Sequence, residues 1–235
     1  MEQADCRWEI GQKMKKELDY FRIGNTYGGN QDWFKDFMMK IGGCAALTAC
    51  DSCIYFDTYQ GTALYPFDRQ RLTKEDYIRF GMLMKPYLRP RWSGIDTLEI
   101  YIDGFQKYLQ DRGCEMITMN PLHGNREAAE AETALKKQID SGLPVPCLLL
   151  RHKKRAFKDY EWHWFLLTGY SLSDAVCPSR RDTDYEGASG NENPEQTCMV
   201  KAVTYGGWQW LDFRELWNTG YERRGGLVLY RHGIA

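Results

Sequence analysis

Three cysteines, Cys44, Cys50 and Cys53, lie close together in one apolar stretch that follows two adjacent glycines. Cysteines in such a stretch can fill a core, bind a metal or act as a nucleophile. The residues from Cys44 onward contain no Gly or Pro, which predicts a buried helix that begins just after the glycines. A helix N-terminus favours a thiolate, because it presents unpaired N–H groups and a partial positive charge. Cys44 is therefore the first candidate nucleophile.

Metal binding is an alternative use of the same cysteines. Cys50 and Cys53 form a C-x-x-C pair and, with Cys44, could bind a structural zinc ion. Tetrahedral zinc needs four ligands and usually a second paired motif, and the chain has no second C-x-x-C. A thioredoxin-type role also fits poorly, since that motif would follow a strand in a βαβ unit. We therefore expect no metal site.

A thiol nucleophile needs a general base, and His163 is the best placed of the four histidines. It lies at the start of an apolar segment, residues 162–170, that has the character of a strand. The alternative is a core histidine that bonds a backbone carbonyl. The three other histidines lie in a loop, in a basic run that we expect to be solvated, and near the C-terminus: His123, His152 and His232. Four tryptophans could line an aromatic cleft or belong to an ordinary core: Trp33, Trp162, Trp164 and Trp208.

The surrounding elements must bring Cys44 and His163 together. Apolar periodicity and capping residues predict helices over residues 7–22, after Thr73, after Asp96 and over 125–142, with a short helix at 213–217. Strands are predicted at residues 146–151, 162–170, 199–205 and 226–231. We expect one α+β domain over residues 1–235, helical over about 1–142 and sheet-forming over about 143–235, with a polar surface loop inserted at 173–198.

Composition narrows the class of protein. The 235 residues carry a formal net charge of −1, which gives no bulk field that would attract nucleic acid or an anionic membrane. No apolar run is long enough to cross a bilayer, and the charged N-terminal segment has no signal-peptide character. We expect a cytoplasmic protein with reduced cysteines that binds neither nucleic acid nor membrane.

The order of these motifs resembles that of the papain-like cysteine peptidases, and of their C39-like branch in particular. Cys44 opens the helix in the sequence CAAL, which is similar to the family's helix motif, and His163 opens a segment that ends in Gly-Tyr. The segment VKAVTYGGWQWLDFRELW is similar to the family's third strand and the short helix after it. The similarity of order spans most of residues 30–217 and extends to uncharacterised bacterial proteins described as cysteine proteases.

The resemblance implies roles for individual residues. Cys44 is the nucleophile, and His163 is the general base that later protonates the leaving amine. Thr204 stands where the family has Asp or Asn and would orient the imidazole. The family's oxyanion Gln is absent from its usual position, so Asn30 or Gln31 would take that role. No metal or organic cofactor is implied, and we expect the Cys44–His163 pair to exist partly as thiolate and imidazolium at neutral pH.

Two further hypotheses remain. The segment CDSCIYF is similar to the C-G-S-C-W signature of papain, which would make Cys53 the nucleophile, although it would then lie inside a helix. The resemblance as a whole implies a thiol hydrolase or acyl transferase acting on a peptide or amide bond. The missing Asp or Asn and the missing Gln favour the alternative of a catalytically inactive papain-like module that binds a peptide or a partner protein.

Overall fold

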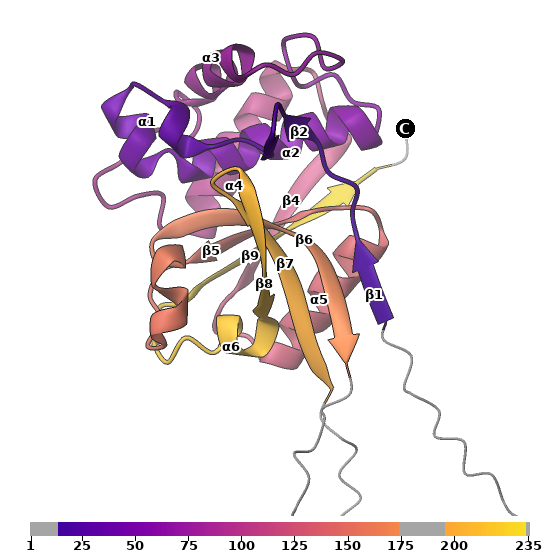
Figure 1. Cartoon of the computed structure of the whole chain (residues 1–235), viewed down its shortest axis with the longest axis vertical. Helices are drawn as coiled ribbons and strands as arrows, with labels where there is room; N and C mark the ends of the chain where they lie inside the picture. Colours follow the sequence, from indigo (N-terminus) through magenta and orange to yellow (C-terminus); the bar gives the residue numbers. More distant parts are fainter. Residues whose placement is uncertain (1–13, 174–195, 234–235) are drawn as a thin grey trace, which may run out of the picture.

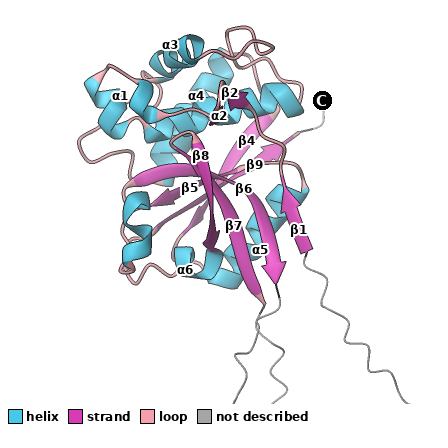
Figure 2. Ribbon diagram, viewed as in Figure 1, coloured by secondary structure: helices cyan, strands magenta, loops and turns pink. Residues whose placement is uncertain are grey.

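A computed structural model of the chain describes residues 14–173 and 196–233. In this described part, a large antiparallel sheet has the strand order β4-β9-β5-β6-β7-β8, with β1 paired to β6, and β2 and β3 form a separate hairpin. Figure 1 shows α1, α2 and α3 gathered at one end of the molecule, above the sheet. The architecture is α+β (Figure 2).

The helices are α1 (Phe37–Gly42), α2 (Cys44–Tyr59), α3 (Lys74–Met84), α4 (Leu98–Asp111), α5 (Ala128–Asp140) and α6 (Phe213–Trp217). Two short 3₁₀ helices are η1 (Gln31–Trp33) and η2 (Arg155–Tyr160). The strands are β1 (Met14–Glu17), β2 (Arg22–Ile23), β3 (Thr26–Tyr27), β4 (Ile117–His123), β5 (Val145–Leu149), β6 (His163–Ser173), β7 (Thr197–Thr204), β8 (Gly207–Asp212) and β9 (Gly225–His232). None of the helices in the described ranges combines the length and apolar character that a membrane span requires.

Helix α2 is the central helix of the fold, because every residue from Cys44 to Asp57 is buried. It follows α1 with a single residue, Gly43, between them. A Cβ atom at Gly43 would lie 2.4 Å from the backbone oxygen of Met39, so the close turn between the two helices requires glycine. The start of α2 is therefore fixed at Cys44 by the backbone, without a side-chain cap.

Strand β6 connects the candidate base to the rest of the sheet. Its first half pairs with β5, where His163 lies opposite Leu149, and β7 pairs along its other edge. The register shifts between Leu167 and Tyr170, and beyond this irregularity β1 pairs with β6. Because β6 and β7 are antiparallel, the start of β6 and the end of β7 meet at the same end of the sheet.

Several predictions from the sequence are confirmed. Helices begin at Cys44 and, after the capping residue Thr73, at Lys74, and the short helix over residues 213–217 is α6. Gly113 follows the end of α4 with a φ of +67°, as a helix stop should. The four predicted strands correspond to β5, β6, β7 and β9, with shifted ends.

The predicted helix over residues 7–22 is wrong where the structure describes it. Residues Met14–Glu17 form β1, Arg22–Ile23 form β2, and residues 7–13 lie outside the described residues. The segment has mixed charge and no continuous apolar stripe, so pairing with the edge of β6 decides its conformation.

The part predicted to be helical, about residues 1–142, also contributes strands to the large sheet. Strands β1 and β4 both come from the first part and join the large sheet. Pairing with β9 makes residues Ile117–His123 a strand, although that segment contains a proline. Strand β8 was not predicted either, and the cap of α4 is Thr97 rather than Asp96.

The predicted loop insert is shorter than residues 173–198. Ser173 is the last residue of β6, and Thr197 and Cys198 belong to β7. Ser173 pairs directly with Thr197, so the two strands extend up to the insert from both sides. Residues 174–195 of the insert lie outside the described residues.

Candidate active site

Cys44 and His163 line the same small cavity, between the first turn of α2 and the end of the sheet. The cavity has a volume of about 20 Å³, which is room for one water molecule or one oxygen atom. Thr204 and Gln31 line it as well. Four of the five residues singled out from the sequence therefore line one cavity, although they come from four separate segments of the chain.

The Cys44 thiol sits against the first residues of β6. The backbone N–H groups of Trp164, which directly follows His163, and of Ala45 and Cys44 at the start of α2 lie close enough to the thiol to stabilise its charged form. The side chain is buried, with 6% of its surface exposed. The thiol is thus held beside the base by the backbone of both elements.

Thr204, at the end of β7, contacts the imidazole of His163. The distance between His163 Nε2 and Thr204 Oγ1 is 2.6 Å. Tyr205, the next residue, lies flat on the imidazole, with ring centroids 4.7 Å apart and an angle of 3° between the planes. The Thr204–Tyr205 pair therefore fixes both the in-plane rotation of the ring and its tilt.

Strained backbone flanks His163 on both sides. Trp162, which directly precedes it, and Tyr205 are the non-glycine residues in the described ranges with positive φ, at 55° and 50°. Tyr205 and Gly206, with a φ of +71°, form the tight turn between β7 and β8, and turns of this type need positive φ at both central positions. Strain of about 1–3 kcal/mol at such residues persists where the surrounding structure enforces it, and it is concentrated at functional sites.

The two candidate amides have different positions. Gln31 lines the cavity, and its Nε2 donates to the backbone oxygen of Lys40 at 2.8 Å, which leaves the second N–H of the amide unassigned. Its Oε1 is buried and has no partner among the described residues. Asn30 instead caps η1 and donates to the backbone oxygen of Tyr205 at 3.0 Å. Asn30 therefore holds the turn that covers His163 and does not line the cavity.

Asp51 is a member of the site that sequence reasoning missed. Cys44, Thr48 and Asp51 lie four and then three residues apart, so they share one face of α2 and line the cavity together. The Asp51 carboxylate accepts hydrogen bonds from Tyr77 at 2.6 Å and from Tyr20 at 2.9 Å. An acidic residue seven positions after a candidate nucleophile, on the same face of a largely apolar helix, is the signal that could have found it.

The same carboxylate anchors the loop that carries Gln31. The backbone N–H of Gly29 lies 3.3 Å from Asp51 Oδ1. A Cβ at Gly29 would lie 1.9 Å from a ring carbon of Tyr77, and one at Gly28 would lie 2.7 Å from Asp51 Oδ2. The two glycines therefore let the backbone pass close to the carboxylate, and the contact with Asp51 fixes the distance between this loop and α2.

Burial controls the electrostatics of the pair. It lowers the pKa of His163 to about 4, because the charged imidazolium loses its hydration. Burial also raises the pKa of the Cys44 thiol, and the backbone hydrogen bonds from Trp164, Ala45 and Cys44 oppose this rise without cancelling it. Thiol and imidazole are therefore both neutral at pH 7. These shifts disfavour the expected thiolate and imidazolium pair, because burial opposes the effect of the helix N-terminus.

The other cysteines of α2 lie elsewhere. Cys50 and Cys53 are fully buried, and positions six and nine residues after Cys44 project from other faces of a helix with 3.6 residues per turn. Neither lines the cavity of His163. Among the described residues, no three His, Cys, Asp or Glu side chains are arranged to hold a metal ion. The geometry favours Cys44 over Cys53 as the partner of His163.

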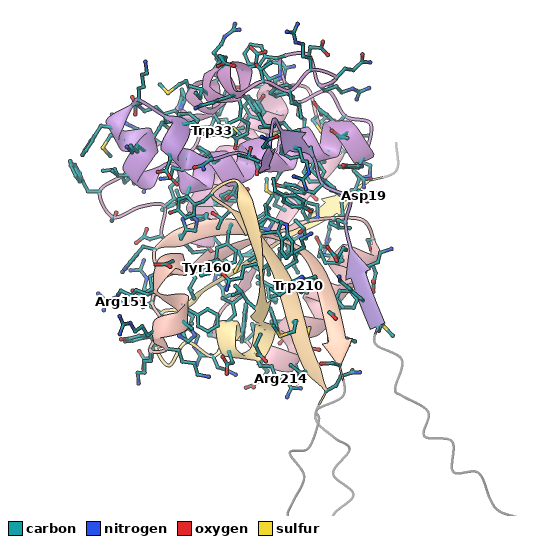
Figure 3. The ribbon with its side chains drawn as sticks, viewed as in Figure 1. Asp19, Trp33, Arg151, Tyr160, Trp210 and Arg214 are labelled. Carbon is teal, nitrogen blue, oxygen red and sulfur yellow. The ribbon has the colours of Figure 1, made fainter. Side chains whose placement is uncertain are left out.

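The prediction for His152 is wrong, and the tryptophans divide between the two roles that the sequence left open. His152 is buried rather than solvated, and its Nε2 lies 2.8 Å from the backbone oxygen of Glu215. Trp164 is buried, lines the small cavity beside Cys44, and donates to the backbone oxygen of Ile95 at 2.6 Å. Trp33 and Trp208 line neither of the cavities that contain Cys44, and Figure 3 shows Trp33 within the helical end of the molecule.

No protein-family model matches the chain, and no curated protein is significantly similar to it.

Proposed function

We propose that this protein is a papain-like thiol hydrolase or acyl transferase that acts on a peptide or amide bond through Cys44 and His163. The observation that carries the proposal is that a thiol on the first residue of a buried helix and an imidazole on the first residue of a central strand line one cavity of about 20 Å³. The order of motifs that resembles the papain-like peptidases supports the same assignment.

The first chemical step transfers a proton and forms one bond. With the proton of the imidazole on Nε2, directed at Thr204, Nδ1 of His163 is the free base. The Cys44 sulfur attacks the carbonyl carbon of the substrate while its proton passes to Nδ1. Because both groups are neutral at rest, this transfer accompanies the attack rather than preceding it.

The cavity then receives the developing negative charge. The carbonyl oxygen becomes an oxyanion, which fits a space of about 20 Å³. The backbone N–H groups at the start of α2 and the remaining N–H of Gln31 are its donors, and one such donor is worth roughly 3–4 kcal/mol in the transition state. His163 returns its proton to the leaving amine, and a thioester between Cys44 and the acyl group remains. Attack by water, or by a second amine, on this thioester releases the product and restores the thiol.

A binding module without catalysis is the second candidate. Two observations favour it: the partner of His163 is a neutral hydroxyl rather than a carboxylate or amide, and burial raises the pKa of Cys44. A hydroxyl orients the imidazole but adds no charge that would stabilise an imidazolium.

A cleavage assay separates the two candidates. The purified chain and its Cys44→Ala variant are incubated with a diverse peptide mixture, and new peptide termini are identified by mass spectrometry. The hydrolase proposal predicts new termini with the native chain and none with the variant. Equal sets of termini with both proteins, or none with either, would leave the binding module as the better assignment.

A further inference from the structure

Cys44 also lines a second, larger cavity on the outer side of the site. This groove has a volume of about 430 Å³, within the range of sites that bind small ligands and side chains. Its apolar wall consists of Ile41, Trp92 and Trp162. The buried thiol therefore lies between an inner cavity that fits one oxygen atom and an outer groove that fits a side chain.

The apolar wall is unusually exposed. Trp92 is 83% exposed, Ile41 48% and Trp162 43%, and Phe37 lies beside Trp92 with ring centroids 6.2 Å apart. Large apolar side chains that gather around a groove, rather than standing singly, mark a binding surface. Trp162 also has a positive φ of 55°. A non-glycine residue keeps this strained conformation only where the surrounding structure enforces it.

The loop that carries Trp92 is fixed against the catalytic elements. The indole of Trp164 in β6 donates to the backbone oxygen of Ile95 at 2.6 Å. On the other side, a Cβ at Gly42 would lie 3.3 Å from the backbone oxygen of Arg91, so this loop packs closely against the turn before Cys44. The groove therefore keeps a constant position relative to the thiol.

The charges around the groove are mainly positive. Arg223 is paired with Asp96 at 2.6 Å, whereas Arg91 has no carboxylate partner among the described residues. Arg151 lies above the ring of Trp162, 5.5 Å from its centroid, and Figure 3 shows it at the outer margin of the molecule. An occupant that satisfies these groups carries an anionic group next to its apolar part.

We infer that this groove is a substrate subsite that binds an aromatic side chain next to the scissile bond, with a carboxylate on the neighbouring residue that pairs with Arg91. The inference rests on the proposed function, because that function defines the scissile bond. An aromatic ring fits between two tryptophans by offset or edge contacts. The carboxylate compensates the unpaired guanidinium.

Binding can be measured without chemistry. The Cys44→Ser chain is titrated with acetyl-Gly-Ala-Phe-Glu-Ala-Gly-amide, and with analogues in which Phe is Ala or Glu is Gln, by calorimetry and tryptophan fluorescence. We expect the Phe peptide to bind about 10-fold or more tightly than the Ala peptide. We expect the Glu peptide to bind about 2- to 5-fold more tightly than the Gln peptide, as a partly exposed ion pair allows.

Variants locate the two preferences. Trp92→Ala in the same background should remove the preference for Phe, and Arg91→Ala should remove the preference for Glu. Both side chains are exposed, so neither substitution disturbs the core. Trp208→Ala is the matched control, because Trp208 is 52% exposed and does not line the groove, and it should leave both preferences unchanged.

The outcomes separate this inference from the proposed function. No binding, binding without preference for Phe, or a preference that persists in Trp92→Ala would overturn the subsite. A concentration-dependent dimer that Trp92→Ala abolishes would also overturn it, because the groove would then be covered by a second copy. Selective binding together with no cleavage of the same peptide by the native chain would retain the subsite and refute the hydrolase.

Discussion

The carboxylate of Asp51 makes a specific contribution to the pH dependence of stability. Burial raises its pKa from 3.8 to about 6, and the hydrogen bonds from Tyr77, Tyr20 and Gly29 only partly oppose this. The folded state therefore holds the proton more tightly than the unfolded state. The stability gained in this way is fully present below about pH 3.8 and is lost as the pH rises through about 6.

The magnitude follows from the two pKa values. The difference between 3.8 and about 6 corresponds to about 3 kcal/mol of unfolding free energy, and about 2 kcal/mol of it falls between pH 4.5 and 7. His163 has the opposite sign: its pKa is lowered to about 4, so its contribution is present above about pH 6.5 and is lost as the pH falls towards 4. The unfolding free energy of the native chain alone would show only the sum of the Asp51 and His163 contributions.

A comparison with Asp51→Asn isolates the carboxylate. Urea unfolding of both proteins between pH 4.5 and 7, followed by circular dichroism, gives the difference in unfolding free energy at each pH. The advantage of the native chain over the variant should shrink by about 2 kcal/mol as the pH rises across this range. Tyr77→Phe is the control: it removes a hydrogen bond to the charged form and should move the transition to higher pH. A difference that does not change with pH, or that grows with pH, would refute this account of Asp51.

Three further predictions concern the elements that hold the site. Thr204→Val removes the hydrogen bond to Nε2 of His163 and should slow alkylation of Cys44 by iodoacetamide about 2- to 10-fold. Thr204→Asn should be alkylated at close to the native rate. Equal rates for all three proteins would contradict an orienting role for Thr204. Gly43→Ala places a Cβ 2.4 Å from a backbone oxygen and should lower the unfolding free energy, measured in urea, by about 1–3 kcal/mol. It should also slow the alkylation of Cys44. An unchanged midpoint of urea unfolding would show that the turn does not need glycine. Replacement of residues 174–196 by Asn-Gly should leave the circular dichroism spectrum and the midpoint of thermal unfolding nearly unchanged, because Ser173 and Thr197 are already paired. Insoluble protein would count against the prediction that the fold does not need the insert.

The sequence was informative where local signals and the fold agree. Helix α2 could be predicted because two glycines precede a largely apolar run without Gly or Pro, and β6 because an apolar run directly follows His163. Thr204 came from the resemblance to a family, and it does contact His163. These signals depend on residues that are close in the sequence or on an ordered set of motifs.

Features that depend on distant segments could not be predicted. Asp51 has partners 26 and 31 residues away, and nothing in its own segment indicates that two tyrosine hydroxyls reach it. Strand β1 pairs with β6 across most of the chain, so its mixed charge pattern was mistaken for a helix. Trp92 stands in a loop with no periodicity, and its role becomes visible only when that loop packs beside Gly42.

The pairing of Cys44 with His163 is tested most directly by the pH profile of Cys44 alkylation. A thiolate beside His163 stabilises the imidazolium, so the ion pair formed by transfer of the Cys44 proton to His163 has an abundance that does not depend on pH while His163 keeps that proton. This contribution adds to the thiolate that forms by loss of the proton to solvent. The rate constant for iodoacetamide, measured by mass spectrometry of the peptide that contains Cys44, should therefore fall by clearly less than about 10-fold per pH unit between about pH 8 and 5 in the native chain.

Without the imidazole, only solvent can remove the thiol proton. In His163→Ala the rate constant should fall about 10-fold for each pH unit below the thiol pKa, so that at pH 6 it lies at least about 10-fold below the native value. Cys53→Ser, in which a fully buried thiol is removed, should reproduce the native profile. A native profile that falls with pH as steeply as that of His163→Ala would contradict the claim that His163 is the base for Cys44.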